Sequence, residues 1–223
     1  MKSLLRQALA ILEKDLLIEY RDKSRFVSVF LFGLLLLLLF SFALSVQPDL
    51  MRKMAAGLFW LTILFSSLLA LEHSFQREME EGQWEGLLLL GTDPRGLYLG
   101  KMLANLFFVF FLQLALLLPM AVLYDIQLSP ALVTILFLGS LGISSLGTFY
   151  AILTTHFRGG QLLLPLLLFP MLIPLLLAVV KVTELTLAHD LFGQQVAWLK
   201  LLTLFDIVFL LVSLLTIETL LDQ

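Results

Sequence analysis

The sequence predicts an all-α, multi-pass membrane protein with six transmembrane helices and little mass outside the bilayer. Hydrophobic residues make up 60% of its 223 residues and charged residues only 14%, and the mean hydropathy is +1.01. A water-soluble domain of this composition would expose large apolar surfaces and aggregate. Five runs without charged residues or histidine are each long enough to cross a hydrocarbon core of roughly 30 Å. We therefore expect a single membrane domain over residues 1–223.

The first 25 residues form an amphipathic segment ahead of the first span. Apolar residues recur there every four positions, and charged residues occupy other faces. The recurring residues are Leu4, Ala8, Leu12, Leu16 and Tyr20. This spacing predicts a helix that lies in the membrane interface; a lead-in with no role of its own is the alternative. The apolar run that follows is too long for a signal peptide, so we expect it to stay as an anchor.

The apolar runs predict six spans. They cover residues 26–47, 54–71, 102–124, 131–155, 161–180 and 201–221. A turn at residues 127–130 precedes the fourth span. Three prolines in the fifth span predict kinks, because each removes a backbone donor and crowds the preceding turn: Pro165, Pro170 and Pro174.

The basic residues predict the orientation of the spans. Ten of the 14 lysines and arginines fall on the side of the N-terminus, and the other four lie on the opposite side. The four are Arg52, Lys53, Lys181 and Lys200. Because cytoplasmic loops are enriched in basic residues, we expect both termini to lie in the cytoplasm.

The most polar stretch after the N-terminus, residues 72–93, lies between the second and third spans on the predicted cytoplasmic side. Acidic residues line one helical face of its first part, and Gly82 is placed to end that helix. Asp93 and Pro94 then suit the N-cap and first turn of a new helix. The pattern favours a stiff protrusion that fits a basic groove on a soluble partner, and a solvated loop is the alternative.

Residues 181–200, on the opposite side, are too polar to span a membrane and too apolar for free water. We expect a short interfacial or re-entrant helix pair there, broken at Gly193.

One ionisable residue, Asp206, falls inside a predicted span. Acids inside membranes are costly and often functional. Two interpretations stay open. Asp206 reaches the outer headgroups near Lys200, or it serves a helix contact or a substrate path.

The sequence offers little chemistry of its own. It has no cysteine, which excludes disulfides, thiolate metal sites and covalent haem attachment to this chain. It contains no nucleotide-binding loop, so the chain cannot itself be an ATPase, and its three scattered histidines predict no metal site. We expect no catalytic residue.

Residues 76–85, Gln-Arg-Glu-Met-Glu-Glu-Gly-Gln-Trp-Glu, followed by Leu87–Leu90, resemble the coupling segment of ABC-2-type permeases. Within that group the chain is similar to the haem exporter protein B family (CcmB) of cytochrome c maturation. Three segments carry that likeness: residues 59–72, residues 82–101, and Phe157-Arg158-Gly159-Gly160 with the proline-rich stretch after it.

The resemblance implies a permease subunit of an ABC transporter in the bacterial inner membrane, with an ABC-2-like fold. It implies a separate ATPase subunit (CcmA-like) that carries ATP and Mg²⁺, and no cofactor bound by this chain. Further implied partners are a CcmC-like haem-handling protein, a small CcmD-like subunit, a periplasmic haem chaperone (CcmE-like) and a second permease copy. The residues implied to contact the ATPase are Glu72, Phe75, Arg77, Glu78, Glu80, Glu81, Gly82, Trp84 and Glu85. Arg158, Gly159 and Gly160 form the matching cytoplasmic loop motif.

Other functions remain open from the sequence. They are an ABC-2-type permease for a lipid, polysaccharide or drug, a secondary transporter, and a haem-binding assembly protein. A secondary transporter would need intramembrane ion-coupling groups, and the predicted spans offer only Asp206.

Overall fold

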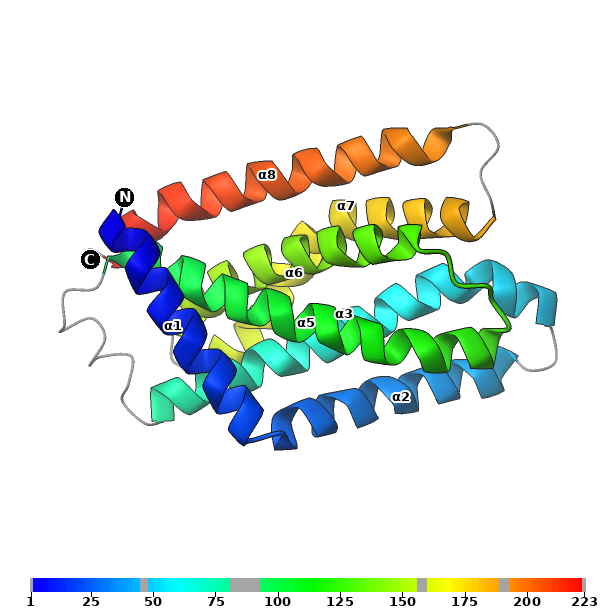
Figure 1. Ribbon diagram of the computed structural model, residues 1–223, viewed down its shortest axis with the longest axis horizontal. Coiled ribbons are helices and arrows are strands. Elements are labelled where there is room, and N and C mark those ends of the chain that lie inside the picture. Colours follow the sequence, from blue (N-terminus) through cyan, green and yellow to red (C-terminus); the bar gives the residue numbers. More distant parts are fainter. Residues whose placement is uncertain (1, 45–47, 81–92, 156–159, 189–192, 222–223) are drawn as a thin grey trace.

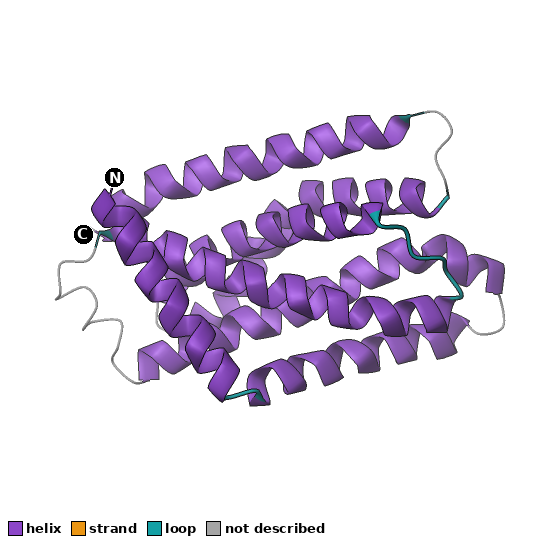
Figure 2. Ribbon diagram, in the orientation of Figure 1, coloured by secondary structure: helices purple, strands orange, loops and turns teal. Residues whose placement is uncertain are grey.

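The computed structural model describes the chain except for residues 1, 45–47, 81–92, 156–159, 189–192 and 222–223. The described residues form seven α-helices and no strand (Figure 2). They are α1 (Lys2–Arg21), α2 (Ser24–Leu44), α3 (Pro48–Glu80), α5 (Pro94–Tyr124), α6 (Ala131–Thr155), α7 (Gly160–Leu187) and α8 (Gln194–Leu221). Six of these helices, all but α1, are long and apolar enough to cross a membrane. The all-α fold class with six spans is therefore confirmed.

The six long helices lie side by side as one bundle, and α1 crosses them obliquely at one end (Figure 1). Both ends of the chain lie at this end, which we call the α1 end (Figure 1). Helix α6 packs against α3, α5, α7 and α8, whereas α2 contacts α3 and α5 at one edge. Helix α8 lies at another edge, against α5, α6 and α7. Accordingly, α3 and α6 are the most buried spans, and α2 and α8 are the least buried.

Small residues let the neighbours of α6 approach it closely. Three of its glycines have no room for a methyl group: Trp60 fills the space at Gly139, Leu175 that at Gly142, and Leu71 that at Gly147. Close backbone approach through small residues is the usual packing mode inside membranes, where lipid tails are as apolar as the helices. The serine hydroxyls of α6 at positions 140 and 144 bond back to carbonyls one turn earlier, so they add no unpaired donor.

Several helices extend beyond the apolar runs. Helix α3 begins at Pro48 and continues to Glu80, well past residue 71. Helix α5 begins at Pro94, before the apolar run that starts at residue 102, as the predicted helix start at Asp93 and Pro94 indicates. Hydropathy marks only the part of a helix that lies in lipid, so polar turns at helix ends escape it. Helix α7 runs without interruption through its three prolines.

The prediction of an interfacial helix pair at residues 181–200 is wrong for the residues that the structure describes. Residues 181–187 complete α7, residues 194–200 begin α8, and Gly193, with φ +70°, precedes α8. Several polar groups of this stretch bond within α7 itself, and Gln195 of α8 donates to the Thr186 hydroxyl of α7 at 2.8 Å. Lys181 Nζ lies 2.8 Å from Glu184 Oε2, and the Thr183 and Thr186 hydroxyls donate to carbonyls one turn earlier. A helix can therefore carry them without a break.

Candidate functional site at the α1 end

The predicted coupling segment emerges at the α1 end, and the structure describes its two flanks. Glu72 is partly buried near the end of α3, and Phe75, Arg77, Glu78 and Glu80 lie in the last turns of that helix. Glu81, Gly82, Trp84 and Glu85 fall outside the described residues, as do Arg158 and Gly159. Gly160 is the first residue of α7. The assignment of these residues to an ATPase contact stays a prediction.

The downstream flank is a capped helix start, as the sequence predicts. The Asp93 side chain accepts a hydrogen bond of 2.9 Å from the Arg95 backbone N–H, and Pro94 occupies the first turn of α5. This cap satisfies a donor that the first turn of a helix otherwise leaves unpaired. The chain therefore re-enters the bundle after residue 92 along a stiff helix.

Helix α1 packs directly on this capped start. A methyl group at Gly100 would lie 2.7 Å from Ile11 Cβ and 2.8 Å from the Ala8 carbonyl oxygen, so only glycine allows this approach. The Gln7 side-chain oxygen accepts a hydrogen bond of 3.2 Å from the Asp93 backbone N–H. Helix α1 thus holds the residue at which the predicted coupling segment ends.

A buried ion pair strengthens the contact between α1 and α5. Lys101 Nζ lies 2.9 Å from Asp15 Oδ2, and the lysine side chain is only 2% exposed. A buried ammonium needs such a partner, because an uncompensated charge inside a protein is strongly destabilising. From the sequence, Lys101 is only a loop charge that contributes to the predicted orientation.

The start of α2 joins the same cluster through Arg25. Its guanidinium lies 2.9 Å from Glu19 Oε2 of α1 and donates to the Ala70 carbonyl of α3, also at 2.9 Å. The guanidinium carbon sits 4.2 Å from the centre of the Phe108 ring of α5, within the range of a cation–π interaction. Arg25 therefore ties α1, α2, α3 and α5 together.

Helix α8 is fixed to the same end by a contact with α5, where Arg95 forms an ion pair with Glu218. Helix α5 also bonds to α6, because the Tyr98 hydroxyl donates to the Ser145 carbonyl at 3.1 Å. We call α1, the starts of α2 and α5, the part of α3 around Ala70 and the last turns of α8 the clasp.

The clasp residues escape the sequence analysis because they are distant in the chain. Helices α2 and α3 lie between Asp15 and Lys101 in the chain, and nothing local marks the two residues as partners. The spacing of Gly96 and Gly100, four residues apart on α5, is the signal that could have located the contact.

Asp206 lies away from the clasp, in the middle of α8. The helix begins at Gln194, twelve residues earlier, which is about 18 Å along the axis. The residue is 1% exposed. The interpretation that it reaches the headgroups is therefore not supported, because α8 begins earlier than the apolar run and places Asp206 deep in the bundle.

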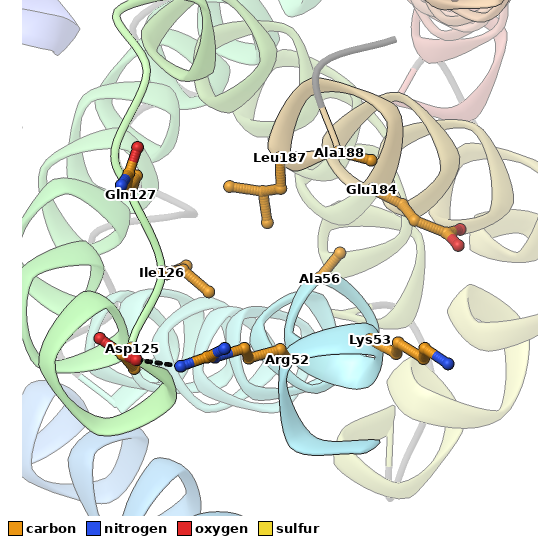
Figure 3. Close-up of a pocket in the computed structure, with 9 residues that line it drawn as sticks. All are labelled: Arg52, Lys53, Ala56, Asp125, Ile126, Gln127, Glu184, Leu187 and Ala188. Carbon is orange, nitrogen blue, oxygen red and sulfur yellow. Dashed lines mark hydrogen bonds and ion pairs between the residues drawn. The ribbon is translucent and has the colours of Figure 1, made fainter. Parts of the chain in front are cut away.

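A cavity of about 330 Å³ opens at the opposite end of the bundle, between α3, α7 and the turn after α5. Arg52 forms an ion pair with Asp125 on one side, and Ile126 and Leu187 face the interior (Figure 3). Lys53 and Glu184 point away from it (Figure 3). No residue predicted as functional lines this cavity.

Comparison with known proteins identifies the family. The family model described as "CcmB protein" matches residues 6–221. The chain belongs to the CcmB family. It is 31% identical over 192 residues to heme exporter protein B of Haemophilus influenzae, covering 85% of this chain and 86% of that protein. It is 34% identical over 174 residues to heme exporter protein B of Paracoccus denitrificans, covering 75% of this chain and 78% of that protein.

A third relative, heme exporter protein B of Rhodobacter capsulatus, is 33% identical over 172 residues, which cover 75% of this chain and 78% of that protein. The CcmB match takes in all seven described helices apart from the first residues of α1. The residues that make the clasp contacts, from Gln7 to Glu218, therefore lie within the matched part of the chain. This chain is a multi-pass membrane protein of the CcmB family.

Proposed function

We propose that this chain is the permease subunit of an ABC transporter complex that acts in cytochrome c maturation. The match to the CcmB family over residues 6–221, with relatives named heme exporter protein B, carries the proposal. In the proposed complex a separate subunit hydrolyses ATP, and hydrolysis drives haem handling and release of a haem-loaded periplasmic chaperone. This chain itself catalyses no reaction.

The proposed coupling element is residues 72–93, which receive motion from the ATPase. The arrangement of the clasp supports this role, because the segment leaves from α3 and returns at the Asp93 cap that α1 holds through Gln7. A push on the segment would turn α5 and α1 as one unit, since Lys101 and Asp15 join them. Arg25 would pass the movement to α2 and α3.

The proposed partners follow from the family. They are a CcmA-like ATPase subunit carrying ATP and Mg²⁺, a CcmC-like haem-handling protein, a CcmD-like small subunit, a CcmE-like haem chaperone and a second permease copy. Haem is handled by the complex, and this chain holds no cofactor of its own. We place it in the bacterial inner membrane with both termini in the cytoplasm, which agrees with both chain ends lying at the α1 end (Figure 1).

The coupling role is tested by reversing charge in the segment. Glu81→Lys and Glu85→Lys chains are expressed with the cognate ATPase, and both co-purification and ATP hydrolysis are measured. We expect both to fall, because acidic side chains at this tip would face basic groups of the ATPase. Asp49→Lys, in the exposed first turn of α3 at the opposite end, is the matched control. Undiminished assembly and hydrolysis in the two glutamate variants would refute the coupling role.

Cargo is tested separately. Deletion of the gene is expected to abolish covalent cytochrome c, which is read from haem staining of membrane proteins. A normal cytochrome c content with a changed envelope lipid or polysaccharide would instead favour the alternative of an ABC-2-type permease for another cargo.

A further inference from the structure

The centre of α8 holds a carboxyl group that has no hydrogen-bond partner among the described residues. Asp206 is 1% exposed, and neither of its side-chain oxygens has a donor among the residues that the structure describes. It packs on α6 and α7: a methyl group at Gly142 would lie 2.6 Å from its Oδ1, and the same point is occupied by Leu175. The site has no room for a bound ion or a larger ligand beside Gly142.

The helices around Asp206 supply no counter-charge. Helices α5, α6 and α7 pack against α8, and α6 carries no charged side chain, Tyr150 being its one titratable group. The charged groups of the other helices pair with each other near the bundle ends: Lys181 with Glu184, Arg95 with Glu218, and Lys101 with Asp15. The two tyrosines of α5 donate elsewhere, Tyr98 to Ser145 and Tyr124 to Leu37, and Lys200 of α8 is exposed near its start.

An ionised carboxylate is not stable in such surroundings. A buried charge requires a partner or water, and inside a membrane its cost is relieved by neutralisation, by snorkelling or by a water defect. Asp206 is too deep in the helix to snorkel and does not line the cavity at the end of the bundle. The carboxyl group is therefore uncharged when α8 lies on α6.

Helix α8 is also one of the helices best placed to move. It is among the least buried of the six spans. Its inward face presents Leu202, Asp206, Ser213 and Ile217 to the bundle. A shift of this edge helix away from α6 would free the carboxyl group and leave the contacts of α6 with α3, α5 and α7 in place.

We propose that Asp206 is an intramembrane proton-binding site that couples protonation to the position of α8. The protonated carboxyl packs against Gly142 and closes α8 on α6. When α8 separates, the O–H bond of the carboxyl breaks and its proton passes to water admitted between the two helices; reprotonation returns α8 to α6. This inference extends beyond the proposed transport role and needs no partner subunit.

The protonation state is tested on the full chain in lipid bilayers by infrared spectroscopy. We expect a carbonyl band of a protonated carboxylic acid that is present at neutral pH and absent in the Asp206→Asn chain. Asp49→Asn, which removes an exposed carboxylate, should leave that band unchanged. Asp206→Glu should retain an acid band at a shifted frequency. A wild-type spectrum without the band would overturn the proposal.

The coupling to α8 is tested by thiol accessibility, since the chain has no cysteine. Ser213→Cys places a thiol on the buried face of α8, where Ser213 is 2% exposed. The rate of its alkylation by a water-soluble maleimide is measured in two chains that differ only by Asp206→Asn. The effect of pH on ionisation of the thiol is then the same in both. When the pH is raised from neutral to alkaline, we expect the alkylation rate of the chain that keeps Asp206 to rise about tenfold more than that of the chain with Asp206→Asn. The reason is that ionisation of the Asp206 carboxyl separates α8 from α6. Equal pH responses in the two backgrounds would overturn the proposal.

Discussion

At the scale of single residues, the packing of α6 depends on side chains that enter the space above its glycines. Trp60 of α3 is 0% exposed and lies over Gly139, and its indole N–H donates to the Thr183 hydroxyl of α7 at 2.9 Å. The ring is thus held on two sides. Trp60 joins α3, α6 and α7, and a larger residue at position 139 must displace a group that is already bonded.

Gly139→Ala is therefore expected to destabilise the bundle. Overpacking of a filled site costs about 1–3 kcal/mol, which outweighs the gain of up to about 1 kcal/mol that alanine gives a helix over glycine. Gly57→Ala is the control, because nothing lies within 4 Å of the methyl group it adds. Thermal unfolding in detergent should show a lower midpoint for Gly139→Ala and an unchanged or higher one for Gly57→Ala. Equal midpoints would contradict this account of α6.

At the scale of helices, α1 is both an interfacial helix and part of the bundle. Leu5, Leu9 and Tyr20 are exposed, as suits a helix in the membrane interface, whereas Ala8 and Ile11 are buried against α5. The sequence predicts the helix and its apolar periodicity but places Ala8 on the same face as Tyr20. The contact with α5 decides which apolar residues face the protein and which face the membrane.

Substitution of Gly100 should lift α1 from α5. Gly100→Val adds an isopropyl group whose first carbon alone would clash with Ile11 and the Ala8 carbonyl, so we expect α1 to detach while the six spans stay folded. Ala8→Cys introduces a single cysteine that reports the detachment of α1. Its labelling by a maleimide should rise severalfold in the Gly100→Val chain and not in a Gly57→Val chain. If the proposed coupling is right, ATPase stimulation is lost although the ATPase still co-purifies. If the cysteine is labelled and stimulation of the ATPase is nevertheless retained, α1 takes no part in coupling.

The sequence predicts the helices better than their contacts. Six apolar runs, the amphipathic start and the Asp93–Pro94 helix start depend on local patterns, and each is confirmed. The sequence does not predict where α7 ends and α8 begins, because polar residues there form ion pairs and hydrogen bonds within the helix. The Asp15–Lys101 pair and the burial of Asp206 depend on which faces meet in space, and a single sequence does not contain that information.

At the scale of the whole molecule, charged residues pair at both ends of the bundle, and the buried pair of Asp15 and Lys101 lies at the α1 end. Among the described residues, the middle of the bundle is mostly apolar, with hydroxyl groups, a few amides and Asp206. In the clasp, α1 pairs with α2 and α5, α2 bonds to α3, and α5 pairs with the last turns of α8, around the two flanks of residues 81–92. In the proposed coupling role, this arrangement would carry a force applied at the α1 end, and the proposed ATPase partner would supply that force.

The most direct test of that account is purification of the chain from its native membrane in mild detergent, followed by identification and quantification of every bound subunit. We predict an ABC-type ATPase in about equal amount to this chain, together with haem-handling membrane proteins. Recovery of a folded chain without any ATPase, under conditions that preserve other membrane complexes, would contradict the account.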